Sequence, residues 1–336
     1  MKTPAPRRQK NAAPIDIVYL WVNGADPVWL DKRQHAYAAW AQKNPQELAV
    51  FGNVAGRYRD NAELLFSLRA LELFFPDHGH VYLVTDGQTP AWLRPSSRLT
   101  VVDHRSLLAP GSAPVFDSGH IESWLHHIPG LSERFFYLND DVFFGQPVDP
   151  EWWFGERLKV FLEPACARHP DTLTPQATAL VNASIQSGQW LAQRFPGYRH
   201  RAQVYSHTPR AMRKSLMHEL ERLAPDWFAQ VRSTVFRSWR IPPIVPDLAP
   251  RWMVQAGYAE QQELNPLFIS TGEPQAAQQF DTLLTHFGQL PFFCINDTCD
   301  EADDDDPRLL RIAHTLQKLL PQPSSFEYVD EACVAA

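Results

Sequence analysis

In the first half of the chain, short apolar runs alternate with segments whose apolar positions recur every three to four residues. The short runs are rich in β-branched and aromatic residues and predict buried strands. They cover residues 15–22, 80–85, 99–104 and 135–138. The periodic segments predict amphipathic helices that begin near residues 26, 61 and 118. An order of strand, helix, strand, strand, helix, strand predicts an α/β sheet with helices packed on it.

The second half of the chain is less regular. We expect helices at 171–195, 210–223 and 309–320, an irregular proline-rich connection at 242–250, and a further strand at 292–297. The aromatic residues at 152–154 are either a platform at the rim of a site or an anchor in the core, and the second reading is favoured about two to one.

All four predicted strands of the first half end in polar residues. The four ends are Asn23-Gly24, Asp86-Gly87, Asp103-His104 and Asn139-Asp140-Asp141. If the strands are parallel, these ends lie together at one edge of the sheet, where α/β proteins bind their ligands. Four such ends in succession therefore indicate a site.

The turn at residues 139–141 separates two apolar runs. Adjacent carboxylates between such runs are costly in an interior unless they meet a cation or a full set of donors. Side chains alternate along a strand, so Asp140 and Asp141 cannot both point into a packed layer. Their oxygens would suit a hard cation, Mg²⁺ or Mn²⁺, shared with substrate phosphates. An acidic turn that only caps the next segment explains the tripeptide equally well.

Composition narrows the class of protein. The 336 residues allow one large domain or two small ones, and a formal net charge of −7 argues against a nucleic-acid binder. Four cysteines without metal or disulfide spacing favour a reducing cytoplasm. No apolar run approaches the roughly 20 residues of a membrane span. Residues 1–14 have basic side chains but no apolar segment after them, which predicts a disordered tail rather than a signal peptide.

A metal-assisted transfer at phosphorus needs carboxylates for the cation, arginines for the phosphate oxygens and a base for the attacking hydroxyl. All three are present among the charged groups near apolar segments, which are Asp26, Arg57, Arg59, Asp86, Asp103, Glu122, Asp140, Asp141, His207, Arg237 and Asp297. This inventory is suggestive but not specific, because most proteins of this size have as many such groups.

Four segments, in order along the chain, resemble a known family. They are residues 15–27; a long segment from Arg57-Tyr58-Arg59-Asp60-Asn61 to Asn139-Asp140-Asp141; Ser206-His207-Thr208-Pro209 with Phe236-Arg237-Ser238; and Phe293-Cys294-Ile295-Asn296-Asp297-Thr298 with Pro323-Ser324-Ser325-Phe326-Glu327. These segments are similar to the four regions of the Stealth proteins, hexose-1-phosphate transferases of capsule synthesis. That family includes the animal N-acetylglucosamine-1-phosphotransferase that tags lysosomal enzymes.

The resemblance implies a glycosyltransferase-A-like, Rossmann-like mixed sheet flanked by helices, with a smaller helical part. We expect a single catalytic domain over residues 15–328 between two tails. Its parts would be a nucleotide-sugar half (15–160), a helical part (161–260) and a closing segment (261–328), and the tails would be 1–14 and 329–336.

The resemblance also implies the reaction. The hydroxyl of a glycan acceptor would attack the phosphorus next to the sugar of a UDP-sugar, with Mg²⁺ or Mn²⁺ bound, giving a phosphodiester and UMP. The protein would be cytoplasmic, with a possible peripheral contact at the inner face of the membrane.

By the same resemblance, the catalytic residues are Glu122, Asp141, His207 and Arg237, the metal ligands are Asp140 and Asp141, and the donor-binding residues are Asn23, Asp26, Arg57, Arg59 and Asp86. Arg237 and Arg59 would neutralise phosphoryl oxygens. Either Glu122 or His207 would take the acceptor proton. The family often has an Asp shortly after the Arg-Ser pair of its third region, whereas this chain has Arg240-Ile241-Pro242.

Two other functions fit the same residues. A metal-dependent glycosyltransferase would use the acidic turn to bind the donor but would attack the anomeric carbon and release UDP. A non-catalytic carbohydrate-binding protein would use the Trp-rich surface and would not need an acidic centre.

Overall fold

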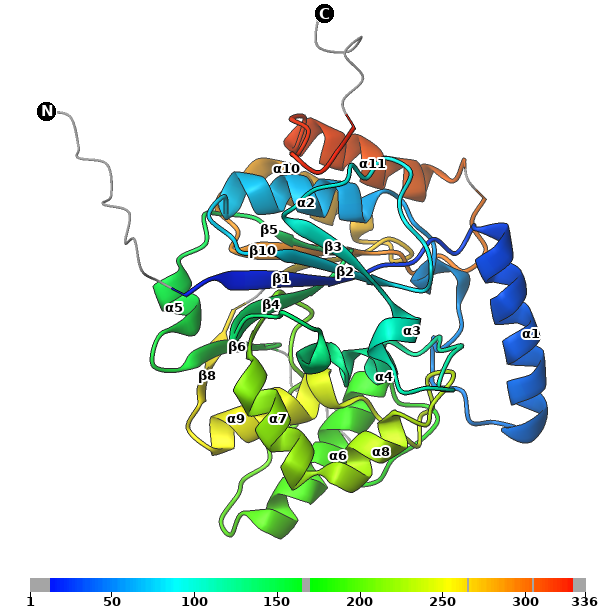
Figure 1. Cartoon of the computed structure of the whole chain (residues 1–336), viewed down its shortest axis with the longest axis vertical. Coiled ribbons are helices and arrows are strands. Elements are labelled where there is room, and N and C mark those ends of the chain that lie inside the picture. Colours follow the sequence, from blue (N-terminus) through cyan, green and yellow to red (C-terminus); the bar gives the residue numbers. More distant parts are fainter. Residues whose placement is uncertain (1–12, 165–169, 265, 304, 329–336) are drawn as a thin grey trace, which may run out of the picture.

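A five-stranded sheet in the order β3-β2-β1-β4-β7 runs through the centre of the protein (Figure 1). Its strands are β1 (Ile15–Leu20), β2 (Val81–Thr85), β3 (Leu99–Asp103), β4 (Arg134–Asn139) and β7 (Arg210–Arg213). The first four are parallel, and β7 pairs antiparallel with β4. The structure, a computed structural model, describes residues 13–164, 170–264, 266–303 and 305–328, so that most of both expected tails lies outside the described residues.

Two small sheets complete the strands. One has the order β5-β10-β9 and the other pairs β6 with β8. Their strands are β5 (Val142–Phe144), β6 (Leu158–Leu162), β8 (Ala259–Glu263), β9 (Leu267–Ser270) and β10 (Phe292–Asn296). Because β5 follows β4 after a two-residue turn, the first small sheet is joined directly to the carboxyl end of the central one.

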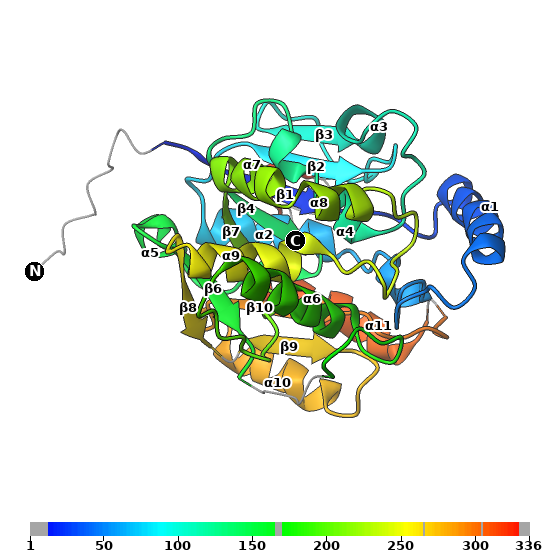
Figure 2. The ribbon, with the colours of Figure 1, turned by 90° about the horizontal axis from the view of Figure 1, so that it is seen from below.

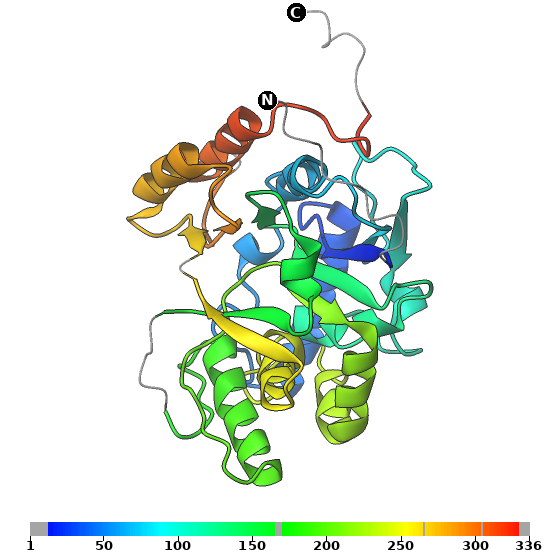
Figure 3. The ribbon, with the colours of Figure 1, turned by 90° about the vertical axis from the view of Figure 1, so that its left-hand side faces the viewer.

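Helices cover both sides of the strands, as Figure 3 shows from the side and Figure 2 from below. One layer contains α2 (Glu63–Phe74), α10 (Ala276–His286) and α11 (Pro307–Leu319). The other contains α4 (Ser118–Glu122), η2 (Leu125–His127), α6 (Ala179–Arg194), α7 (Lys214–Leu223), α8 (Pro225–Val231), η3 (Ile244–Leu248) and α9 (Ala249–Gln255). The remaining helices are α1 (Pro27–Lys43), η1 (Ala55–Arg57), α3 (His104–Leu107) and α5 (Pro150–Phe154). Among the described residues, no helix combines the length and apolar character that crossing a membrane requires.

Aromatic packing around β4 holds the layers together. Phe136, on β4, makes edge-to-face contacts with Phe144, Trp153 and Phe154. Trp153 and Phe154 are buried, so the segment at 152–154 is mainly a core anchor, as favoured from the sequence. Such pairs add about 0.5–1.5 kcal/mol each beyond burial of their area. The expected α/β fold with a mixed sheet flanked by helices is confirmed.

Two expected helices are wrong in part. Residues 210–213 form β7 instead of the first turn of a helix, because they pair with the edge of β4. The helix expected from residue 118 ends at Glu122 and gives way to η2. Arg232 explains this break, because its Nη2 donates 2.6 Å to the carbonyl of Ser123, which would otherwise accept a helical hydrogen bond.

Two further expectations need correction. The proline-rich connection is not irregular throughout, since it contains the π-helix η3 and then α9, which has a proline in its first turn. The part expected to be helical, 161–260, also supplies β7 and β8, which pair with strands of the first half.

The buried imidazole of His78 predicts a stability that depends on pH. Its Nδ1 lies 2.7 Å from the carbonyl of Gly79, and its Nε2 lies 3.2 Å from Nη2 of Arg98, which suits only the neutral ring. Burial, followed by the charge of Arg98, lowers the pKa of His78 from 6.5 to about 4. The unfolded chain therefore takes up the proton first as the pH falls, and stability is lost between about pH 6.5 and pH 4.

We expect this one group to remove on the order of 3 kcal/mol from the free energy of unfolding across that range. Urea unfolding at pH 7.5 and pH 4 would measure it. The variant His78→Asn should lose less stability than the wild type on acidification, whereas replacing the exposed His35 by Asn should change nothing. Equal acid sensitivity in His78→Asn and the wild type would contradict the prediction.

Candidate active site

The polar ends of the parallel strands lie at one edge of the sheet, as predicted. Leu20 at the end of β1 is in register with Asn139 at the end of β4, and Thr85 with Asp103. The amide of Gln88 makes two hydrogen bonds, of 3.0 and 2.9 Å, with the backbone of Asn23. These bonds hold the loop after β1 against the loop after β2.

Asp141 lies in the turn between β4 and β5 and contacts three polar side chains. Its Oδ1 is 3.2 Å from Nε2 of His207. Its Oδ2 accepts from Nδ2 of Asn296 at 3.1 Å and lies 3.4 Å from Sγ of Cys294. Burial by itself would raise the pKa of Asp141, but His207 and the other donors outweigh it and lower the pKa below 3.8. Asp141 is therefore a carboxylate anion at neutral pH.

Asp140 lies in a different environment. Burial, and then the negative charges of Asp141, Glu63 and Asp60, raise its pKa well above the usual 3.8. Burial also raises the pKa of Glu63 to about 8, although the hydrogen bonds from Asn61 act to lower it. A group of carboxyls that repel one another in this way is stabilised by a cation.

The donor atoms fit a hard divalent cation. Asp140 and Asp141 offer carboxylate oxygens, which Mg²⁺ and Mn²⁺ prefer. Ligand atoms of Asp141, His207 and Cys294 also lie within 4.8 Å of one another. A thiol is a poor ligand for Mg²⁺, so for this ion the carboxylates are the donors and the other two side chains position Asp141.

Glu122 is connected to the acidic turn through Tyr137 of β4. The hydroxyl of Tyr137 lies 2.9 Å from Oε1 of Glu122 and 3.0 Å from Oδ1 of Asn139. Oε2 of Glu122 is buried and has no hydrogen-bond partner among the residues that the structure describes. Arg210 is close by: burial lowers its pKa, and the charge of Glu122 acts in the opposite direction. Glu122 thus has one positioned oxygen and one that is available for another group.

Arg57 and Arg237 lie near enough for the charge of one to act on the other. Nη2 of Arg237 donates 2.6 Å to Oγ of Ser118, and its Nε is 3.5 Å from Oδ1 of Asp117. Burial, and then the charge of Arg237, lower the pKa of Arg57. Asp117 is the carboxylate that faces both, and it also accepts a hydrogen bond of 2.8 Å from Thr234. Two guanidinium groups beside one shared carboxylate leave a positive surplus that favours an anion such as phosphate.

The structure places the other expected donor-binding residues in local contacts. Arg59 forms an ion pair with Asp297 and donates to the carbonyls of Cys299 and Ala302. Asp86 pairs with Lys32 of α1. Asp26 caps α1, and the side chain of Asn23 closes the turn before it. Their binding of a donor stays a prediction.

Sequence reasoning missed several residues of this site: Asn296, Cys294, Glu63, Asp117, Tyr137 and Arg210. The strand expected at 292–297 had a polar end that contains Asn296, so this residue could have been found. Asp117 stands directly before the helix at 118, where an N-cap is expected, and its side chain does accept from the amide of Gly119. The remaining four have no local sequence pattern that marks them.

Comparison with family models gives two matches. Residues 57–161 match the model described as Stealth protein CR2, conserved region 2, and residues 13–36 match Stealth protein CR1, conserved region 1.

Curated relatives share a common name. An exopolysaccharide phosphotransferase of Streptomyces coelicolor is 37% identical over 323 residues, which is 95% of this chain and 53% of the relative. The exopolysaccharide phosphotransferase CpsY of Mycobacterium tuberculosis is 30% identical over 330 residues, which is 97% of this chain and 60% of the relative. The chain therefore spans little more than half the length of these relatives.

Solved structures give weaker matches. The galactosyltransferase LgtC in complex with donor and acceptor sugar analogs is 11% identical, with a TM-score of 0.44 over 95% of this chain and 98% of that chain. The glycosyltransferase GlyE of Streptococcus pneumoniae is 8% identical, with a TM-score of 0.41 over 92% of this chain and 63% of that chain.

Proposed function

The chain belongs to the Stealth family, and we propose that it transfers a sugar-1-phosphate from a UDP-sugar to a hydroxyl group of a glycan acceptor. The products would be a phosphodiester and UMP, made in the synthesis of an exopolysaccharide or capsule. Two kinds of observation support the proposal: the relatives are named exopolysaccharide phosphotransferases, and the site has groups suited to phosphoryl transfer.

The observation that carries the proposal is the position of α4 between two groups of opposite charge. At its first residue, Ser118 accepts a hydrogen bond from Arg237, beside Arg57. At its last residue, Glu122 accepts from Tyr137, which leads to the acidic turn. Four residues of an α-helix rise about 6 Å. A positive pair and an acidic turn at this spacing suit a substrate that is a metal-bound diphosphate.

The residues of the chain can then be given roles. Arg57 and Arg237 would bind phosphoryl oxygens, and Asp140 and Asp141 would hold Mg²⁺ or Mn²⁺. When bound, such a cation supplies charge neutralisation for the diphosphate. The acceptor oxygen would form a bond to the phosphorus next to the sugar while the bond from that phosphorus to the oxygen of UMP breaks.

The proton of the acceptor hydroxyl needs a base, and the two candidates from the sequence both lie at this site. His207 is 3.2 Å from Asp141, which would hold its ring in position. Glu122 has its buried, unpartnered Oε2. Comparing the pH–rate profiles of His207→Asn and Glu122→Gln would separate them, because only loss of the base removes the corresponding limb of the profile.

Identification of the released nucleotide tests the proposal. We expect the protein, incubated with Mg²⁺, a glycan acceptor and a panel of UDP-sugars, to release UMP with one donor. Attack at phosphorus leaves the bond between C1 and its oxygen intact, so the product should keep the donor's anomeric configuration and show a phosphodiester resonance in ³¹P NMR. Release of UDP, with a product that lacks phosphorus, would instead make the protein an ordinary glycosyltransferase.

A further inference from the structure

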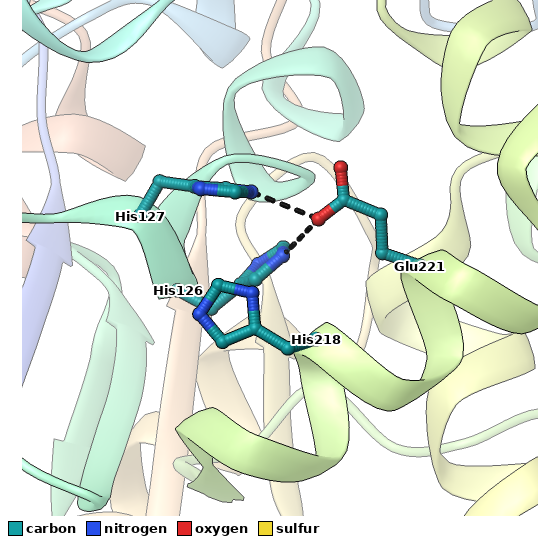
Figure 4. A group of neighbouring side chains, drawn as sticks. All are labelled: His126, His127, His218 and Glu221. Carbon is teal, nitrogen blue, oxygen red and sulfur yellow. Dashed lines mark hydrogen bonds and ion pairs between the residues drawn. The ribbon is translucent and has the colours of Figure 1, made fainter.

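Three histidines and a glutamate gather outside the candidate active site (Figure 4). His126 and His127 are adjacent in η2, and His218 and Glu221 are three residues apart on α7. Residues at this spacing lie on the same face of a helix. Figure 4 shows the side chains of both elements pointing toward one another.

The ligand atoms of this cluster are close enough to surround one ion. One nitrogen of each histidine and one carboxylate oxygen lie within 4.8 Å of one another. Oε2 of Glu221 is 2.7 Å from Nε2 of His126 and 2.8 Å from Nε2 of His127. In a tetrahedral zinc site, with bonds of about 2.0–2.1 Å, neighbouring ligand atoms are about 3.3 Å apart. To admit the ion, the two contacts of Glu221 would therefore lengthen by roughly half an ångström, and ligand atoms as far as 4.8 Å apart would approach by up to about 1.5 Å.

The protonation states suit a metal. Burial, together with the neighbouring histidines, lowers the pKa of His126 to about 4. The same two causes lower the pKa of His218. In both cases Glu221 acts in the opposite direction but is outweighed. These rings are neutral at pH 7 and have a lone pair to offer. The hydrogen bonds from His126, Arg232 and His127 outweigh burial and lower the pKa of Glu221, so this group is a carboxylate. A neutral ring and an anionic carboxylate are the forms that bind a cation.

Positive charge around the cluster is the main opposing feature. Arg232 pairs with Oε1 of Glu221, and Lys214 and Arg222 act on His218. Arg232 contacts Oε1 of Glu221, the oxygen that the two imidazoles do not contact. Arg232 is itself held by a hydrogen bond to the carbonyl of Ser123 and by its guanidinium carbon, which lies 3.8 Å from the centre of the Trp124 ring. It therefore orients the carboxylate and leaves Oε2 for an ion, as outer partners of metal ligands do.

We propose that His126, His127, His218 and Glu221 form a structural Zn²⁺ site that ties η2 to α7. Three imidazoles and one carboxylate are a donor set that zinc accepts in tetrahedral geometry. His126 is fully buried, whereas about a third of His127 is exposed, which gives the ion a path from solvent. Because η2 begins three residues after Glu122, a bound ion would also steady the end of α4 that carries this candidate catalytic residue.

Zinc stoichiometry tests the site without any assay of activity. The full chain is stripped of metal, dialysed against Zn²⁺ and analysed for bound metal, as wild type and as His218→Ala, Asp141→Asn and His286→Ala. His218 is partly exposed, so its truncation should leave the fold intact. His286 is an exposed histidine on α10 and serves as the matched control. We expect His218→Ala to bind one equivalent less than the wild type, whereas Asp141→Asn and His286→Ala keep that equivalent.

Two further measurements need no loss-of-ligand variant to fold. Co²⁺ bound to the wild type should give the intense visible absorption of tetrahedral nitrogen and oxygen coordination. Zn²⁺ at 100 times its dissociation constant should stabilise the fold of the wild type about 100-fold in the unfolding equilibrium. Equal zinc content in the wild type and His218→Ala, or an equivalent that disappears with Asp141→Asn instead, would show that the cluster is a hydrogen-bonded network without metal.

Discussion

Replacing Asp141 by Asn is expected to lower the rate of sugar-phosphate transfer by at least about 10²-fold while the protein stays folded. Loss of one charged group at a phosphoryl centre costs on the order of 3 kcal/mol of barrier. The amide has the size of the carboxylate, so the packing is kept, but its single acceptor oxygen cannot serve both His207 and Asn296, and one of these contacts is lost together with the charge. The rate of UMP release and a urea unfolding curve would measure the two halves of this prediction.

The matched control is Asp281→Asn, on the exposed face of α10. Asp281 forms an exposed ion pair with Arg311, and its loss should leave the rate unchanged. Chelation of the divalent metal should abolish transfer by the wild type. Full activity in EDTA, or an Asp141→Asn rate within a factor of about three of the wild type, would remove Asp141 from the role of metal ligand.

The central sheet could be predicted from the sequence because its determinants are local. The strands β1, β2 and β4 are mainly apolar runs buried on both faces, whereas β3, at the edge of the sheet, is largely exposed. The polar residues that follow end the apolar run of β4, so that Asn139, Asp140 and Asp141 mark the edge of the sheet where the candidate site lies. The candidate site could be located from the same pattern.

The contacts between residues of the site could not be predicted from local patterns, because these residues come from distant parts of the chain. Asp141 meets His207 from 66 positions away and Asn296 from 155 positions away. The second contact depends on the antiparallel pairing of β10 with β5, which no periodicity in either segment indicates. Arg57 and Arg237 likewise meet only through the fold, and each alone reads as an ordinary surface arginine.

The same reasoning explains why β7 was predicted as part of a helix. Residues 210–213 are followed directly by the strongly amphipathic α7. The sequence pattern therefore does not mark where the helix begins, and it predicts a helix from residue 210. Pairing with the open edge of β4 satisfies the backbone of this segment and overrides its weak local preference. The functional consequence is that Arg210, at the start of β7, is placed beside Glu122.

Replacing Arg237 by Lys is expected to reduce kcat/KM by about 10²-fold although the charge is kept. A guanidinium has a planar fork of donors that can hold Ser118 with one nitrogen and phosphate oxygens with others. An ammonium is a point donor and cannot do both. Next to the buried Arg57, a lysine would also lose its proton more readily, because its ordinary pKa is about two units lower than that of arginine.

Arg240→Lys is the control, since Arg240 is three residues away, more than half exposed and paired with Glu47. It should keep wild-type activity, because an exposed ion pair contributes little and a lysine can replace it. If Arg237→Lys also works nearly as well as the wild type, the guanidinium of Arg237 only supports Ser118 and Asp117. The phosphate contact would then belong to Arg57 alone, and Arg57→Lys should show the loss that Arg237→Lys does not. Loss in both variants would mean that the phosphoryl group is held between the two guanidinium groups, which is the arrangement that their shared carboxylate, Asp117, favours.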